Sequence, residues 1–162
     1  MTMQKINPDH IDSIISLMNK SPYFNLLSIV VKDLNIGYSL LEVDIENRHL
    51  NPFGGVHGGV YSSVIDTAAY WAAYCELDEN AGLISLDLNV NFLAPVRSGK
   101  LIVKGQRIKT GKTLCIAEAA AFDQEDKMVA HGTSKMMVTQ GLQTITQAVA
   151  SEELTSLPDK FI

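Results

Sequence analysis

The segment from His57 to Leu77, HGGVYSSVIDTAAYWAAYCEL, constrains the fold of this chain more than any other. It is rich in alanine, and it contains no proline and no glycine after Gly59. Its apolar residues lie nearly all round a helix, which is typical of a helix that is buried on most sides. The sequence therefore predicts a long helix, at about residues 57–76, at the centre of the fold.

The rest of the chain predicts mainly strands. A short amphipathic helix is predicted over residues 8–19, beginning at Asn7-Pro8 and ended by Ser21-Pro22. Strand-like patterns cover residues 27–34, 38–46, 83–93, 100–109, 113–122 and 127–138, and the tail from 141 to 162 is weakly patterned. This order of elements predicts an α+β fold, in which a mostly antiparallel sheet packs on one long helix.

The composition is typical of a globular protein of one domain, residues 1–162, with its core at about 25–140. The net charge is −5 and no basic stripe is present, which argues against a nucleic-acid partner. The N-terminus has no signal-peptide pattern and no apolar run is long enough to span a bilayer, so we expect a cytoplasmic protein with no membrane partner. No motif has metal-ligand spacing, and we expect no metal and no cofactor.

Asp66 stands in the middle of the apolar helix. Because burying an unpaired charge is costly, this carboxylate must be paired, neutralised or functional. The helix taken alone leaves a purely structural role open, in which Asp66 accepts hydrogen bonds from a nearby loop.

The start of the same helix, His57-Gly58-Gly59, offers a second chemical group. The first N–H groups of a helix lack partners within it and lie at the positive end of its dipole. They can stabilise a carbonyl oxygen that becomes negative in a tetrahedral intermediate. An ordinary turn from loop to helix is the alternative interpretation of the glycine pair.

The spacing of these two groups has a geometric consequence. Gly58 and Asp66 are separated by eight residues, or roughly 12 Å along one helix axis. Both cannot contact the same carbonyl, whereas two antiparallel copies of the helix would bring Gly58 of one chain near Asp66 of the other. If both residues are catalytic, the enzyme is at least a dimer.

Asn51, His57-Gly58-Gly59 and Asp66 together form the pattern N-x5-H-G-G-x6-D. This pattern resembles the signature of hotdog-fold thioesterases of the phenylacetate-degradation and human-thioesterase-superfamily type. The stretches SLDLNVNFLAPVRSGKL and GKTLCIAEAAAFDQEDKMVAHGTSKMMV resemble the same family, so that the resemblance spans about residues 35–139. It implies a hotdog fold, with the sheet wrapped around the central helix, and hydrolysis of acyl-coenzyme A thioesters to a free acid and coenzyme A.

The resemblance also implies a role for each matching residue. Asp66 is expected to be a general base that activates water, or a nucleophile, and the Gly58 N–H to polarise the thioester carbonyl. Asn51 is expected to position water or the thioester, His57 to orient the loop, and Ser85 to assist the carboxylate, although a solvated Ser85 is the alternative from its place in the strand pattern. A homodimer, assembled as a dimer of dimers into a homotetramer, would carry the active sites at its interface.

Coenzyme A carries phosphates, which cations can bind. Arg97, Lys109 and Lys112 stand at strand ends or in the hairpin around Gly111, where exposed cations could meet these phosphates. A plain solubilising surface is the alternative interpretation for each of them.

Three residues of the helix are candidates for contacts with the rest of the substrate. Gly59 permits close approach of a substrate to the backbone. Val60 lies where it could line an acyl cavity or belong to the core. Tyr70, one turn after Asp66, is bulkier than the small residue that the resemblance implies at that position, so it would change the shape of the acyl pocket.

Two other functions remain open at the level of the sequence. Hotdog hydratases and dehydratases place a histidine and a carboxylate differently, and this chain has no match to their motif. A hotdog sensor would bind acyl-CoA without cleaving it, but such regulators usually carry a DNA-binding segment, and the N-terminal helix is too short for a helix-turn-helix. Release of free thiol from an acyl-CoA separates hydrolysis from binding alone.

Overall fold

The computed structural model describes residues 5–151 and 156–162. Its elements follow one another along the chain in the order α1 (Pro8–Met18), α2 (Pro22–Leu27), β1 (Ile29–Asn35), β2 (Tyr38–Asp44), a 3-10 turn (Asn47–His49), α3 (Gly58–Tyr74), β3 (Ala81–Phe92), β4 (Lys100–Thr110), β5 (Leu114–Phe122), β6 (Met128–Gln140) and α4 (Ile145–Ser151).

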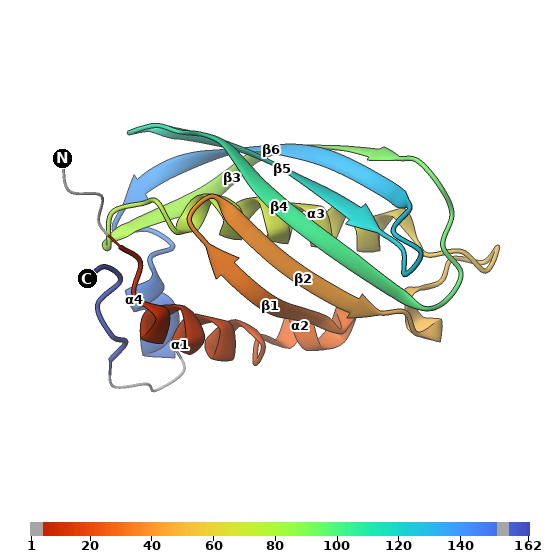
Figure 1. The fold of residues 1–162 in the computed structure, drawn as a ribbon, viewed down its shortest axis with the longest axis horizontal. Helices are drawn as coiled ribbons and strands as arrows, with labels where there is room; N and C mark the ends of the chain where they lie inside the picture. The colour runs from red at the N-terminus through yellow and green to blue at the C-terminus, as the bar shows by residue number, and fades with distance from the viewer. Residues whose placement is uncertain (1–4, 152–155) are drawn as a thin grey trace.

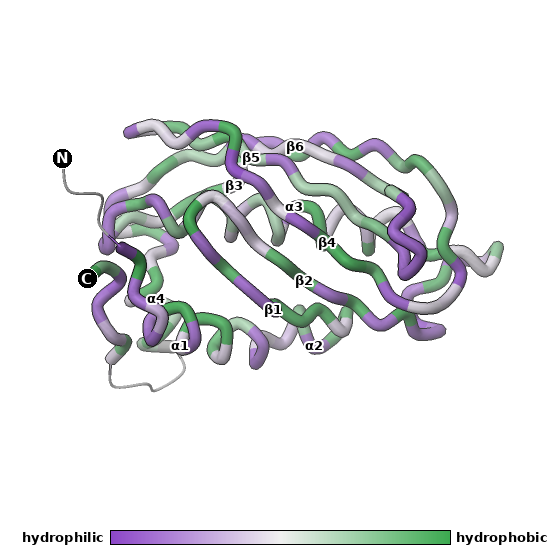
Figure 2. Tube along the Cα trace, in the orientation of Figure 1, coloured by the Kyte–Doolittle hydropathy of each residue, from purple (hydrophilic) through white to green (hydrophobic). Residues whose placement is uncertain are grey.

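The strands form a six-stranded sheet in the order β1-β2-β4-β5-β6-β3, and every neighbouring pair is antiparallel. The strand β3 therefore lies at one edge, where it pairs with β6, although it follows directly after α3 in the chain. Hydrophilic and hydrophobic residues alternate along the strands, as expected for a sheet with one face turned to the core (Figure 2). The α+β fold class predicted from the sequence is confirmed.

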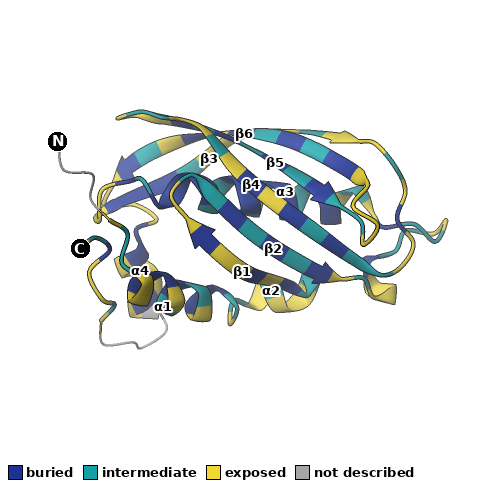
Figure 3. Ribbon diagram, viewed as in Figure 1, coloured by how far each residue is buried: buried dark blue, intermediate teal, exposed yellow. Residues whose placement is uncertain are grey.

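The sheet curves around α3, which contacts all six strands and is buried along most of its length (Figures 1 and 3). Small residues let the two layers approach closely. A Cβ atom added to Gly105 on β4 would lie 2.2 Å from the Ala68 carbonyl oxygen of α3. The Ser39 hydroxyl on β2 donates a hydrogen bond of 2.7 Å to the same carbonyl. Close packing of this kind fixes the position of α3, and thus of any side chain that it carries.

The two ends of the chain lie together beside the C-terminal end of α3. Ile6 forms an antiparallel bridge with Phe161, and the Asn7 N–H donates to the Lys160 carbonyl at 2.9 Å. The helices α1 and α2 run along the outside of β1 (Figure 1). The N-terminal and C-terminal segments, which are far apart in the sequence, are thereby joined.

The helices differ from expectation at three points. The predicted helix over residues 57–76 is present but ends at Tyr74. The predicted cap on α1 is confirmed, because the Asn7 side chain accepts a hydrogen bond from the Asp9 N–H. The helix α1 ends at Met18, before Ser21-Pro22, which instead begins α2, with Ser21 as N-cap and Pro22 in the first turn. The helix α4 was not expected, because only Ile145 and Val149 are buried among residues 145–150, and so short an apolar face gives little periodicity.

Candidate active site

Asp66 lies midway along α3, half-buried against the edge strand β3. Ser85 on β3 donates a hydrogen bond of 3.1 Å from its hydroxyl to Asp66 Oδ1. Burial raises the pKa of the Asp66 carboxyl above its usual value, and the hydrogen bond from Ser85 opposes this shift. The arrangement is that of a carboxylate held in place and made more basic than one in water, which suits the acceptance of a proton from a reacting group.

A β-bulge explains how Ser85 reaches α3. The register between β3 and β6 shifts between Ser85 and Asp87. A bulge of this kind re-aims the side chains on either side of it. Ser85 is therefore both exposed to solvent, as the strand pattern alone allows, and hydrogen-bonded to Asp66.

The first turn of α3 leaves one N–H group available. His57 is the N-cap, and its Nδ1 accepts from the Gly59 N–H at 2.8 Å, while its carbonyl accepts from the Val60 N–H at 2.9 Å. Among the described residues the Gly58 N–H has no hydrogen-bond acceptor. A Cβ atom at Gly58 would lie 3.3 Å from Phe92 Cζ, so a side chain at this position would contact the Phe92 ring.

The loop before α3 is organised by Asn51. Its Oδ1 accepts from the Phe53 N–H at 2.9 Å and from the Gly55 N–H at 3.3 Å, an arrangement that shapes a tight turn. Arg97 Nη1 donates to the Phe53 carbonyl at 3.1 Å and braces the same turn from outside. The Asn51 oxygen is thus occupied by the loop, and the group that it can still offer to a substrate is the Nδ2 amide.

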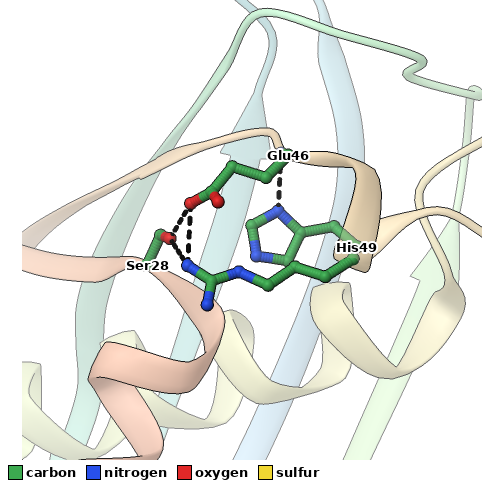
Figure 4. Close-up of polar contacts among 4 residues, drawn as sticks. Ser28, Glu46 and His49 are labelled. Atoms are coloured by element: carbon green, nitrogen blue, oxygen red, sulfur yellow. Dashed lines mark hydrogen bonds and ion pairs between the residues drawn. The ribbon is translucent and has the colours of Figure 1, made fainter.

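The other end of this loop is anchored to the start of β1 by a polar cluster (Figure 4). Ser28 and Arg48 both donate hydrogen bonds to Glu46 Oε1, and the Glu46 N–H donates to Nδ1 of the buried His49 at 2.9 Å. The His49 carbonyl in turn accepts from the His57 N–H at 2.8 Å. This chain of contacts ties the N-cap of α3 to the sheet.

The predicted substrate-binding residues fall into separate regions. Arg97 lies beside the loop at the start of α3, whereas Gly111 and Lys112 line a cavity at the opposite end of the helix. Lys109 is an exposed residue near the end of β4 in the same region. One protomer therefore does not bring the three cations together.

The three residues of α3 that were predicted to contact the substrate also lie in different environments. Val60 is buried in the core, and Gly59 is exposed at the helix start. Tyr70 lies one turn beyond Asp66, where its ring packs edge-on against Trp71 with 5.1 Å between centroids. Tyr70 is the one of the three that lies near the carboxylate and lines a cavity.

Two polar groups at the end of α3 were missed by the sequence analysis. Glu76 accepts from Arg107 at 2.7 Å and from the Thr110 hydroxyl at 2.6 Å. Lys160 is fully buried, and its Nζ donates to the carbonyls of Tyr74, the last residue of α3, and of Leu77, just beyond the helix. The contacts of Glu76 and of Lys160 both join residues that are distant in sequence, so the local pattern does not predict them. A lone lysine in a tail also gives no sign that it is buried.

Within residues 5–151 and 156–162, no three His, Cys, Asp or Glu side chains gather into a group that could hold a metal ion. In the same part of the chain, no helix is long and apolar enough to cross a membrane.

Comparison with known proteins identifies the family. The model of the thioesterase superfamily matches residues 53–130, which include the start of α3, Asp66 and Ser85. A protein of Halobacterium salinarum named as an esterase is 31% identical over 114 residues, which cover 67% of this chain and 75% of that protein. The chain belongs to the thioesterase superfamily.

Other members of the thioesterase superfamily resemble it over most of their length. Human acyl-coenzyme A thioesterase 13 is 26% identical over 123 residues, covering 74% of this chain and 87% of the human protein. The crystal structure of a thioesterase from Haemophilus influenzae has a TM-score of 0.75 and 23% identity, covering 82% of this chain and 92% of the other. The hotdog fold expected from the sequence is confirmed, and at the level of the family the chain is a thioester hydrolase.

Proposed function

We propose that this protein hydrolyses acyl-CoA thioesters, with Asp66 as its catalytic carboxylate. The observation that carries the proposal is the half-buried Asp66 carboxylate, oriented by Ser85 and raised in pKa by burial. Water adds to the thioester carbonyl carbon and gives a proton to Asp66. The carbon–sulfur bond then breaks, and coenzyme A leaves as a thiol after taking up a proton. Attack by Asp66 itself, through an anhydride that water hydrolyses, is the other course open to this carboxylate.

The oxyanion of the tetrahedral intermediate needs a donor, and the Gly58 N–H supplies it in this proposal. It is the N–H at the start of α3 for which the described residues show no acceptor. Because it lies roughly 12 Å from Asp66 along the helix axis, the donor at each site belongs to a second copy of the chain. The active site is then shared across a homodimer interface.

The edge strand β3 supports such a dimer. An unpaired strand edge offers N–H and C=O groups to another strand, and proteins rarely leave one uncovered. Two large apolar residues of β3, Leu86 and Phe92, are 57% and 58% exposed in the single chain. Pairing of β3 with its copy would cover them and set two α3 helices side by side. Assembly of two dimers into a tetramer stays a prediction.

Coenzyme A is proposed to bind as part of the substrate, and the reaction as written needs no other cofactor. Arg97, Lys109 and Lys112 are proposed to contact its phosphates. Since Arg97 lies at the opposite end of α3 from the lysines, an antiparallel partner helix would bring the Arg97 of one chain toward the lysines of the other.

Thiol release tests the function directly. Wild-type protein and the Asp66→Asn variant are incubated with a panel of acyl-CoAs and a thiol reagent. The wild type is expected to release thiol, and the variant to lose at least about 10²-fold in kcat, because the proton acceptor is gone. The variant should melt no lower than the wild type at neutral pH, since it removes a charge whose burial is unfavourable. Binding of acyl-CoA without thiol release would instead support a sensor, and equal turnover would remove Asp66 from the mechanism.

A further inference from the structure

The 3-10 turn before α3 carries a histidine that is buried as deeply as the apolar core. His49 is 1% exposed, whereas its neighbours Asn47 and Arg48 in the same turn are exposed. A polar ring in the interior must form hydrogen bonds that offset its loss of water. The contacts of this ring therefore decide how the turn is held.

The His49 ring and the Glu46 backbone hold each other in one arrangement (Figure 4). The Glu46 N–H donates to His49 Nδ1 at 2.9 Å, and the His49 N–H donates to the Glu46 carbonyl at 2.9 Å. Because Nδ1 accepts, the ring is neutral and its proton is on Nε2. Burial lowers the pKa of His49, which favours this neutral form. The Nε2 proton is directed toward the Leu27 carbonyl at the end of α2, with looser geometry than an ordinary hydrogen bond.

The backbone of the same turn holds the residue before Gly58. The His57 N–H donates to the His49 carbonyl at 2.8 Å. The residues between them continue this pairing, since Leu50 and Val56 form an antiparallel bridge. The position of His57 therefore depends on the position of the turn, and the turn depends on the buried ring.

The direction of the Gly58 N–H follows from the peptide unit that it shares with His57. This unit is planar and trans, so its N–H points away from its C=O group. The C=O group accepts from the Val60 N–H at 2.9 Å, within the first turn of α3. The Gly58 N–H consequently points out of the N-terminal end of the helix, where no described residue accepts from it. A displacement of His57 moves this donor with it.

We propose that His49 is a positioning residue for the reaction, and that its buried ring holds the Gly58 N–H where the oxyanion of the tetrahedral intermediate forms. The inference rests on the proposed function and adds a residue to the same site. A hydrogen-bond donor lowers the barrier most when it is fixed before the charge develops. A displacement of about 1 Å can cost roughly 10²-fold in rate. His49 itself contacts no substrate, because its ring is buried.

Three substitutions of His49 separate its hydrogen bond from its bulk. Oδ1 of asparagine is bonded to Cγ, as Nδ1 of histidine is, so His49→Asn keeps an acceptor for the Glu46 N–H. His49→Gln carries the same amide one bond farther out, and His49→Leu has no acceptor. We expect kcat to fall by about tenfold or more in the leucine and glutamine variants. KM should change little, because the groups that bind acyl-CoA are kept, and His49→Asn should keep most of the wild-type kcat.

His10→Leu is the matched control for the loss of a buried histidine. His10 is also 1% exposed, and its ring nitrogens contact the Pro158 carbonyl at 2.6 Å and the Tyr74 hydroxyl at 3.0 Å, at the opposite end of α3. Both leucine variants should melt at a lower temperature than the wild type, but only His49→Leu should lose kcat in assays well below its melting temperature. Equal losses of kcat in the two leucine variants, or a wild-type kcat in His49→Gln, would overturn the proposal. So would a His49→Asn variant that is no faster than His49→Gln.

Amide hydrogen exchange, followed by NMR, reports on the same contact without turnover. The His57 amide should exchange faster in His49→Gln than in the wild type and at the wild-type rate in His49→Asn, while amides in the middle of α3 keep their protection. If His49→Leu does not fold, the asparagine and glutamine variants carry both measurements. An unchanged exchange of the His57 amide in His49→Gln would overturn the proposal. Absence of thiol release from every acyl-CoA would instead refute the hydrolase, and the anchoring of His57 by His49 would then be decided by the exchange alone.

Discussion

Ser85 donates a hydrogen bond of 3.1 Å to Asp66, and this contact joins the edge strand of the sheet to the middle of the central helix. The two residues lie nineteen positions apart in the sequence. A hydroxyl that donates to the ionised carboxylate stabilises that form, whereas burial of Asp66 favours the neutral one. Ser85 therefore sets how far the pKa of the carboxylate rises.

Replacement of Ser85 by alanine should move the pH dependence of the reaction. Without the hydroxyl the pKa of Asp66 rises further, so the acid limb of the kcat/KM profile should shift to higher pH. Well above this limb the loss of rate should be smaller than in Asp66→Asn, because the base is still present. Thr67→Ala is the matched control, since Thr67 also carries a hydroxyl on α3 but donates it to the Ser63 carbonyl. An acid limb at the wild-type pH in Ser85→Ala would show that the contact has no influence on the base.

The sequence predicted the centre of this fold because one signal there is strong. Seventeen helical residues with apolar side chains on nearly all sides can be accommodated only inside a sheet or a bundle, and α3 lies where this requires. Asp66 and Gly58 could be singled out for the same reason, since each contrasts with its surroundings. The predicted strands differ from the observed ones mainly at their ends.

The exposure of side chains on the edge strand β3 could not be predicted from the sequence pattern alone. Apolar and polar residues alternate over residues 83–93 of the sequence, and this alternation alone would place Leu86 and Phe92 on one face with Leu88 and Val90. In the structure Leu86 and Phe92 are exposed, because of the bulge after Ser85 and because the strand has no neighbour on its outer side. A bulge depends on the partner strand, so it leaves no trace in the local sequence.

The helix α4 and the burial of Lys160 were also not predicted from the sequence pattern, although the sequence holds one signal for the start of α4. Thr144 and Gln147 have the spacing of a capping box, which predicts a helix start when an apolar residue follows, as Ile145 does. Lys160 gave no such signal. Its burial depends on carbonyls more than eighty residues earlier in the chain.

Lys160 should make stability depend on pH in the alkaline range. Its ammonium lies 3.8 Å from the Tyr74 ring centroid and donates to the Tyr74 and Leu77 carbonyls, at 2.7 and 2.8 Å. Burial lowers its pKa from 10.5 to about 8. Between these two values the unfolded chain binds the proton and the folded one does not, so the free energy of unfolding should rise with pH.

Lys160→Met provides the comparison. At neutral pH this variant should be less stable, because two buried carbonyls, at and just beyond the end of α3, lose their donor, at a cost of about 1–3 kcal/mol each. The stability difference between wild type and variant should then grow from pH 8 to pH 9, by about 1 kcal/mol, measured by urea unfolding. Cys75, whose pKa burial raises from 9.0 to about 12, acts in the opposite direction above pH 9, so the comparison is confined to pH 8–9. A difference that stays constant with pH would contradict the assigned shift.

The lysines of the β4–β5 hairpin should affect the nucleotide part of the substrate alone. Lys109→Ala and Lys112→Ala are expected to raise KM for an acyl-CoA several-fold and to leave KM for the matching acyl-pantetheine thioester unchanged, because the lost phosphate contact is absent there. Lys32→Ala is the control, because Lys32 is an exposed lysine on β1, the edge strand on the other side of the sheet from β3. Arg97→Ala should raise KM for both substrates, since Arg97 also braces the Asn51 turn. Equal effects of the lysine variants on the two substrates would remove them from the site.

The shared active site can be tested by mixing two inactive chains. Gly58→Pro removes the N–H donor at a position where proline suits a helix, and His57 before it already has the extended backbone that proline requires. Gly58→Ala keeps the N–H and is the control, because its methyl group meets only the exposed Phe92 ring. We expect Gly58→Pro and Asp66→Asn each to be inactive alone, and Gly58→Ala to keep its activity.

Refolding Gly58→Pro and Asp66→Asn together in equal amounts places half of the chains in mixed dimers. If each site combines Gly58 of one chain with Asp66 of the other, one site of every mixed dimer collects both substitutions and its twin collects neither. Activity should then recover to about a quarter of the wild-type value, by the symmetry of a two-fold interface. If both groups served a site within one chain, every site would keep one lesion and no activity would return. A mixture without recovery, in which mass spectrometry confirms mixed dimers, would therefore place the donor and the carboxylate in the same chain or remove the Gly58 N–H from the reaction.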